Sequence, residues 1–165
     1  VLLIKLKEIM KKILSLPQTK DNFGLIHTDI HEGNMVIDDH GKFTIFDFDD
    51  SAYKHFISDI AIVIFYQFAF REVTVKDRSE STVKILRPFL KGYRKNNFLA
   101  KEEFNNLNLF LQLRQVTLYI ALKSSGQEIT STDWAKWYFR IYRDAIVNDI
   151  DFIDINDILG QLDFS

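Results

Sequence analysis

The sequence predicts one domain of the α+β class, mainly α-helical with a single small β-hairpin. The composition supports a packed globular domain, because 47% of the 165 residues are hydrophobic and only 6 are Gly and 2 are Pro. Most apolar residues recur at helical spacing, which indicates helices. Two short β-branched runs flank Asp38-Asp39-His40-Gly41, where Gly41 can supply the positive φ that a tight hairpin turn requires.

The N-terminal part of the chain predicts a helix, a loop and then the hairpin. Apolar residues recur at helical spacing over residues 2–13, and we expect Pro17 to end that helix. Residues 18–24 are polar and predict a loop. Met35-Val36-Ile37 and Phe43-Thr44-Ile45-Phe46 predict the two strands of the hairpin.

The rest of the chain predicts helices. We expect a buried helix over residues 60–70, and a second helix that is capped by Ser79 or Ser81 and runs to about Tyr93. A third, long helix is expected from about Phe104 to Lys123. Another should begin within residues 130–133, and a short one should lie within residues 150–164. Pro88 is expected to kink the second of these or delay its start, and Gly126 to cap the third.

The composition excludes several functional classes. A net charge of -2 provides no general attraction for nucleic acid or for an anionic membrane surface. The absence of Cys excludes disulfides, thiolate metal sites and a thiol nucleophile. No signal peptide is visible and the most apolar run is too short to span a bilayer, so we expect a cytoplasmic protein without membrane insertion. Because the chain begins with Val1, we expect it to be part of a longer protein.

Two polar motifs around the predicted hairpin indicate phosphoryl transfer. The first is His27-Thr28-Asp29-Ile30-His31-Glu32-Gly33-Asn34, and the other is Ile45-Phe46-Asp47-Phe48-Asp49. An Asp, an Asn shortly after it and a further Asp beyond two strands match a known arrangement. In it, one carboxylate receives the proton of an attacking hydroxyl, while the amide and the other carboxylate hold metal ions. Because the hairpin folds back on itself, we expect Asn34 and Asp47 to lie close in space.

Five polar residues of the two motifs have expected roles. Asp29 would be the catalytic base, or would orient the acceptor hydroxyl. Asn34 and Asp47 would bind Mg²⁺, which prefers oxygen ligands. His27 is expected to brace the catalytic loop through hydrogen bonds, and His31 to brace it or touch substrate.

Two further carboxylates are candidates near the site. Asp59 precedes an apolar run, where a carboxylate needs hydrogen bonds, so we expect it to support the site by accepting them from the backbone of the catalytic loop. Asp49 is a candidate for substrate contact or for the shell around the metal, and a solvated side chain is the alternative.

These motifs resemble those of the aminoglycoside phosphotransferase and choline kinase-like family. The motif at residues 27–34 resembles the family's catalytic loop, and Ile45-Phe46-Asp47-Phe48-Asp49-Asp50 resembles its metal-binding aspartate segment. Ser58-Asp59-Ile60-Ala61 is similar to the Asp-x-Ala element that follows, and the match is specific over residues 25–62. The resemblance implies a protein kinase-like fold, ATP or GTP with Mg²⁺ as cofactors, and a small-molecule hydroxyl as acceptor.

The resemblance also implies a division of the chain. Residues 1–165 would form the helical C-terminal lobe, with the catalytic loop and metal hairpin at 25–50 and a helical subdomain at 58–165. The Gly-rich loop and phosphate-binding Lys of the N-terminal nucleotide lobe are absent from the sequence, so we do not expect this chain alone to turn over. The short spacing from Asp47 to Asp59, and Asp49 where a protein kinase has Gly, favour a small-molecule kinase.

Several alternatives stay open at the level of the sequence. The protein could be a non-catalytic kinase-like scaffold or an atypical protein Ser/Thr kinase. His27 and His31 would bind zinc together if they lay on one helix. The aromatic stripe over residues 134–142 is either core packing or a cation–π site for an amine. The acidic region after Asp144 is either a solvated face or an acidic cleft. The acceptor and the oligomeric state are not predicted.

Overall fold

Helices make up most of the structure, as the composition and periodicity predicted. The computed structural model describes residues 1–164. In chain order the elements are α1 (Leu2–Leu14), β1 (Phe23–Ile26), the 3-10 turn η1 (Glu32–Asn34), β2 (Met35–Ile37), β3 (Phe43–Ile45), β4 (Ala52–His55), α2 (Ile57–Phe68), α3 (Val75–Tyr93), α4 (Lys101–Phe104), α5 (Leu107–Ser124), α6 (Gly126–Thr130), α7 (Asp133–Val147) and α8 (Ile155–Gln161). No helix within the described range is long and apolar enough to cross a membrane.

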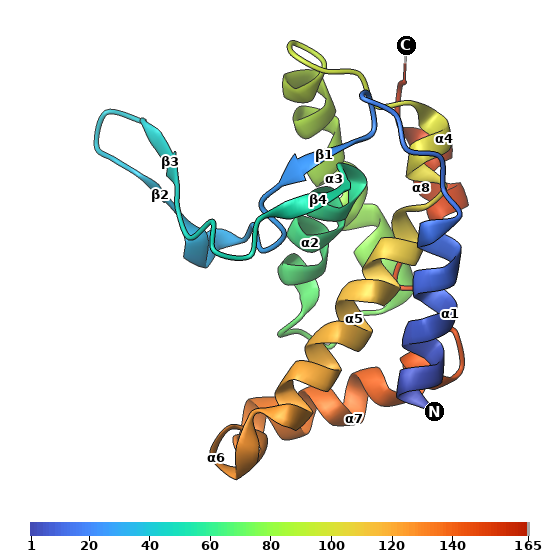
Figure 1. Cartoon of the computed structure of the whole chain (residues 1–165). Coiled ribbons are helices and arrows are strands. Elements are labelled where there is room, and N and C mark those ends of the chain that lie inside the picture. The colour runs from blue at the N-terminus through green and yellow to red at the C-terminus, as the bar shows by residue number, and fades with distance from the viewer. Residues whose placement is uncertain (165) are drawn as a thin grey trace.

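The long helix α5 forms the centre of the helical part, with α1, α2 and α7 packed against it (Figure 1). Because neighbours cover α5 on several sides, apolar residues occur around much of its surface rather than along one stripe. The core includes Phe65 of α2, Leu111 of α5 and Tyr138 of α7, none of which is exposed to solvent. Burial of this apolar surface is the main source of the stability of the fold.

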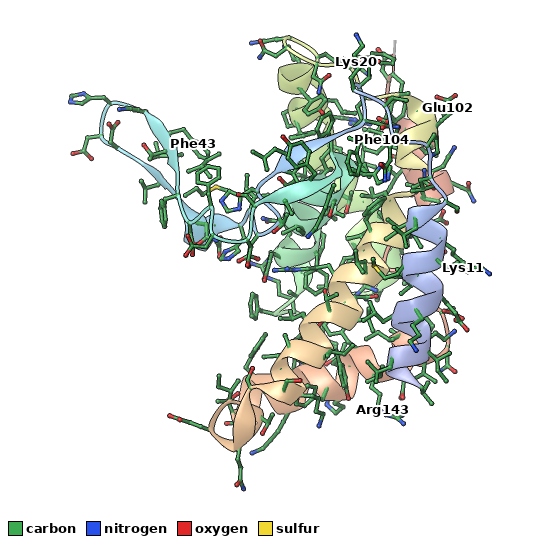
Figure 2. The ribbon with its side chains drawn as sticks, in the orientation of Figure 1. Lys11, Lys20, Phe43, Glu102, Phe104 and Arg143 are labelled. Carbon is green, nitrogen blue, oxygen red and sulfur yellow. The ribbon has the colours of Figure 1, made fainter. Side chains whose placement is uncertain are left out.

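The four strands form two separate antiparallel pairs. β1 pairs with β4, with Phe23 opposite His55, and β2 pairs with β3, with Met35 opposite Ile45. The first pair lies beside α2, whereas the β2–β3 hairpin projects away from the helices (Figure 1). Figure 2 shows the contrast between Phe43, which is 50% exposed on this hairpin, and Phe104, which is buried among the helices.

The turn and cap predictions have mixed outcomes. Gly41 adopts a φ of 76° in the hairpin turn, as expected. Gly126, which follows the C-cap Ser125 of α5, has a φ of 80°, which fits the predicted end of that helix. The hydroxyl of Thr132 accepts a hydrogen bond from the backbone N–H of Ala135 and caps α7 within the predicted stretch.

Two predictions about element boundaries are wrong, and one of the two alternatives for Pro88 is excluded. Neither Ser79 nor Ser81 caps α3, because Thr74 does so by accepting from the backbone N–H of Asp77, and Ser79 is buried inside the helix. Pro88 does not delay α3, since the helix begins well before it and continues through it. A strand starts at Phe23, inside the predicted loop, because that segment pairs with β4, which was not predicted.

Candidate active site

The catalytic loop, residues 27–34, is held by a carboxylate from α2. Asp59 accepts hydrogen bonds from the backbone N–H groups of His27 at 2.9 Å and Thr28 at 2.8 Å. Thr28 has a φ of 69°, a left-handed conformation that is unfavourable for a β-branched residue. The two bonds to Asp59, and a third from the Thr28 hydroxyl to the carbonyl of Asp50 at 2.7 Å, offset this strain. The backbone hydrogen bonds expected for Asp59 are therefore present, and they fix the backbone directly before Asp29.

His27 connects the catalytic loop to the hairpin. Its ring is buried, and Nε2 lies 2.9 Å from the carbonyl oxygen of Phe46. The backbone N–H of Asp29 donates to Nδ1 of the same ring at 3.4 Å. Because Nδ1 accepts, the neutral imidazole carries its proton on Nε2, which then donates to Phe46. This tautomer ties the loop that bears Asp29 to the strand that precedes Asp47.

Asn34 and Asp47 are brought together by the register of the hairpin. The backbone N–H of Phe46 donates to the carbonyl of Asn34 at 3.1 Å, so Asp47 follows the residue paired with Asn34. The side-chain Nδ2 of Asn34 donates to the carbonyl of Asp29 at 2.9 Å. Its amide oxygen has no hydrogen bond to any described residue. Asp47 is exposed and has a φ of 63°. The hairpin therefore presents one amide oxygen and one carboxylate.

One amide oxygen and one carboxylate are too few donors for a metal site made by protein side chains alone. Within residues 1–164, no group of three or more His, Asp or Glu side chains could hold a metal ion. Mg²⁺ is usually bound by one or two protein oxygens, with phosphate oxygens and water completing its shell. His27 and His31 lie in a loop rather than on one helix, which removes the basis for the alternative of a shared zinc ion.

Asp29 has an unpredicted cationic partner, Arg114 of α5. The guanidinium donates to Oδ1 of Asp29 and also to the hydroxyl of Tyr66 on α2. Its central carbon lies 5.0 Å from the centroid of the Tyr66 ring. Burial raises the pKa of Tyr66, and the nearby guanidinium opposes that rise. One signal in the sequence could have indicated this contact, because Arg114 is the only charged residue from Leu107 to Leu122 of α5.

His31 lies near the other oxygen of the Asp29 carboxylate. Its Nε2 is 3.4 Å from Oδ2 of Asp29, the same distance as Nδ2 of Asn34. Its Nδ1 accepts from the backbone N–H of Gly33 at 3.0 Å, and its ring centroid is 4.6 Å from that of Tyr66. Asp49, by contrast, is exposed and forms no hydrogen bond or ion pair within the described residues.

Comparison with known proteins places the chain in a family. A model of the phosphotransferase enzyme family, APH, matches residues 2–93. The chain belongs to this family. It is 37% identical to amicoumacin kinase of Bacillus subtilis (strain 168) over 111 residues, which are 67% of the chain and 33% of that relative.

Solved structures extend the similarity to nearly the whole chain. The amicoumacin kinase hAmiN in complex with AMP-PNP, Ca²⁺ and Ami superposes with a TM-score of 0.82 at 30% identity, over 95% of this chain and 47% of that one. A microcompartment-associated aminopropanol kinase has a TM-score of 0.63 at 20% identity, over 93% of this chain and 46% of that one, and supports the fold alone. The chain therefore spans about a third of the curated relative and about half of the solved ones, and it has the kinase-like fold of their matching part.

The remaining aromatic and acidic features have structural explanations. Tyr138 and Tyr142 of α7 are buried against Phe65, so the predicted aromatic stripe is core packing. Burial raises the pKa of Tyr142 to about 12, and the neutral hydroxyl donates to the carbonyl of Phe68. In the acidic region, Asp149 is exposed and pairs with Lys5, which fits a solvated face.

Proposed function

We propose that the protein is an ATP- or GTP-dependent phosphotransferase that transfers the γ-phosphate to a hydroxyl group of a small molecule. The chain would be its C-terminal catalytic lobe, with residues 25–50 as catalytic loop and metal hairpin and residues 58–165 as helical subdomain. The observation that carries the proposal is the arrangement of Asp29, Asn34 and Asp47: the side chain of Asn34 donates to the carbonyl of Asp29, and the carbonyl of Asn34 accepts from Phe46, directly before Asp47. Membership of the phosphotransferase family supports it.

Each residue of the site has a role in this proposal. Asp29 orients the acceptor hydroxyl and receives its proton as the oxygen attacks. Asn34 and Asp47 bind Mg²⁺, with Asp49 as a candidate for its outer shell. When bound, the metal neutralises charge on the phosphates of the nucleotide. His27 and Asp59 hold the loop in place, and His31 supports the carboxylate of Asp29.

The relatives support the choice of cofactors and acceptor. The amicoumacin kinase structure contains AMP-PNP and Ca²⁺, a nucleotide and a divalent cation. Amicoumacin is a small organic molecule, which agrees with the short spacing from Asp47 to Asp59 that favoured a small-molecule kinase. Since ATP and GTP are intracellular nucleotides, we propose a cytoplasmic location.

The test compares Asp29→Asn with a matched control, Asp39→Asn, in the complete gene product. Asp39 lies in the exposed hairpin turn and has no hydrogen bond to a described residue, so the same chemical change there should leave activity unchanged. We expect Asp29→Asn to lower phosphate transfer from ATP to a screened hydroxyl acceptor by about 100- to 10,000-fold, with an unchanged circular dichroism spectrum. Normal turnover by this variant would refute the mechanism.

Calorimetry separates the enzyme from a kinase-like scaffold. We expect the complete wild-type protein to bind ATP in the presence of Mg²⁺, and Asp47→Ala to weaken that binding. A folded wild-type protein that binds neither ATP nor GTP with Mg²⁺ would favour the scaffold.

A further inference from the structure

Arg114 occupies a position that the roles of base and metal ligands leave unexplained. It lies in the middle of α5, and its side chain is 19% exposed, next to an Asp29 side chain that is 28% exposed. One guanidinium nitrogen, Nη2, donates both to Asp29 and to the hydroxyl of Tyr66. The contact joins residues that are 85 positions apart in the sequence, so only the packing of α5 against the catalytic loop creates it.

Contacts from two sides determine the orientation of the Asp29 carboxylate. Arg114 holds Oδ1 from the side of the helices. His31 and Asn34 approach Oδ2 from the catalytic loop, each at 3.4 Å, which is long for a hydrogen bond. Oδ1 therefore has a strong, charge-assisted partner, whereas Oδ2 keeps capacity to accept a further hydrogen bond.

Tyr66 fixes the guanidinium in turn. Its hydroxyl accepts from Arg114, and the planar guanidinium lies 5.0 Å from the ring centroid, a favourable cation–π distance. The ring of Tyr66 also contacts that of His31, at 4.6 Å between centroids. Arg114, Tyr66 and His31 thus form one continuous set of contacts around Asp29.

A purely stabilising role explains Arg114 poorly. Its Nε–H is buried and has no hydrogen-bond partner among residues 1–164. Burying a donor without a partner costs stability, and an apolar side chain at this point of α5 would avoid that cost. Polar groups left unsatisfied in a folded protein call for an explanation, and contact with a reacting carboxylate provides one.

We propose that Arg114, held by Tyr66, is a positioning residue that fixes Oδ1 of Asp29 so that Oδ2 faces the acceptor hydroxyl. The proposal rests on the proposed phosphotransferase function. Positioning matters here because phosphoryl transfer requires the hydroxyl oxygen to be aligned with the phosphorus, and a displacement of about 1 Å can lower the rate about 100-fold. Arg114 itself does not need to touch the acceptor.

Steady-state kinetics on the complete gene product test this role. We expect Arg114→Gln to lower kcat about 10- to 100-fold with little change in the KM of the acceptor, because alignment affects the transition state more than binding. Arg114→Lys keeps the charge and should recover part of the loss. Tyr66→Phe keeps the ring and should lose less than Arg114→Gln. Arg140→Gln is the matched control, since Arg140 is exposed and its ion pair with Glu72 is long, at 3.8 Å.

A double-mutant cycle adds a readout that does not depend on activity. Asp29→Asn, Arg114→Gln and the double variant are compared by urea denaturation. If the ion pair forms, the unfolding constant of the double variant should differ by about 5- to 10-fold from the product of the two single effects. A coupling of zero would show that the contact is absent in solution and overturn the proposal.

The outcomes separate this proposal from the proposed function. An active wild type whose Arg114→Gln variant keeps its kcat overturns the positioning role alone. An unchanged kcat together with faster ATP hydrolysis in the absence of acceptor would show that Arg114 shields the carboxylate instead, which also overturns it. A wild type that transfers phosphate to no hydroxyl acceptor refutes the proposed function, and the positioning role with it, even where the cycle detects the ion pair.

Discussion

The helical part and the loop-hairpin segment, residues 27–50, are stabilised in different ways. In the helical part, large side chains such as Phe65 and Leu111 are fully buried. In the loop-hairpin segment, Phe43 and Phe48 are 50% and 57% exposed, and Thr28 and Asp47 adopt left-handed backbone conformations. Burial stabilises the first region, while specific hydrogen bonds hold the other. The comparison teaches that the residues proposed for catalysis lie where packing contributes least.

A few contacts join the two regions. Asp59 of α2 holds the start of the loop, and Arg114 of α5 reaches Asp29. Both come from helices that pack against each other in the core. The packed helices can therefore fix the position of the loop-hairpin segment through these two side chains, although that segment has little core of its own.

The largest expected difference between the regions comes from the same substitution made in each. Phe65→Ala should lower the free energy of unfolding by about 3–5 kcal/mol, because it leaves a cavity among the rings of Tyr138, Tyr142 and Phe152. Phe43→Ala should lower it by less than about 1 kcal/mol, since half of that side chain already contacts solvent. Urea denaturation of the two variants measures both values. Equal losses would mean that the exposed face of the hairpin is buried in the complete protein.

Asp59→Asn should lower both the stability of the fold and the activity of the site, with a smaller loss of stability than Phe65→Ala. The substitution keeps one oxygen acceptor but places an N–H₂ group against a backbone N–H of the loop, so one buried donor loses its partner. We expect the free energy of unfolding to fall by about 2 kcal/mol. Phosphate transfer should fall about tenfold or more, because Asp29 follows the released Thr28.

Asp77→Asn provides the control for Asp59→Asn. Asp77 also lies in the first turn of a helix and accepts from a threonine hydroxyl, but it is exposed. A loss below about 1 kcal/mol with normal activity is expected there. If Asp59→Asn lost stability but kept full activity, the bonds to the loop would not determine the position of Asp29.

The sequence predicted most of the helical part because its signals are local. The helical spacing of apolar residues, the threonine cap before α7 and the glycine after α5 each depend on neighbours within a few residues. The cap of α3 was assigned wrongly although its signal is local, because Thr74 accepts from the backbone N–H of Asp77, three residues on. Ser79 lies inside the helix instead, where its hydroxyl accepts from the backbone N–H of Asp154. That contact joins distant parts of the chain, which no local pattern reveals. β4 was missed for the same reason, since its partner is β1.

The candidate site could be predicted only in part, for a related physical reason. Asp29, Asn34 and Asp47 lie in motifs whose spacing is itself the signal, and the structure places them around one loop and one hairpin. Their roles in catalysis stay predictions. Arg114 could not be assigned from the sequence, because its contact with Asp29 depends on how α5 packs against α2. The sequence signal that Arg114 leaves is a single charge in a long uncharged stretch of α5.

The smallest expected effect compares two glycines with the same backbone conformation. Gly126, after α5, has a φ of 80°, and Gly41, in the hairpin, has a φ of 76°. Neither has an atom within 4 Å of where a Cβ would lie, so an Ala would add strain without a clash. We expect Gly126→Ala to lower the free energy of unfolding by about 1 kcal/mol, because the strain acts on a helix end that belongs to the cooperative core.

Gly41→Ala adds similar strain but should leave global unfolding nearly unchanged, because the hairpin can open locally while the helices stay folded. The expected readout is hydrogen exchange, which should accelerate about fivefold at the turn amides of Gly41 and Asp38, both hydrogen-bonded within the turn. Amides of α5 should exchange at their wild-type rates. If Gly41→Ala instead lowered global stability as much as Gly126→Ala, the hairpin would unfold together with the helices, and the two regions would be one cooperative unit.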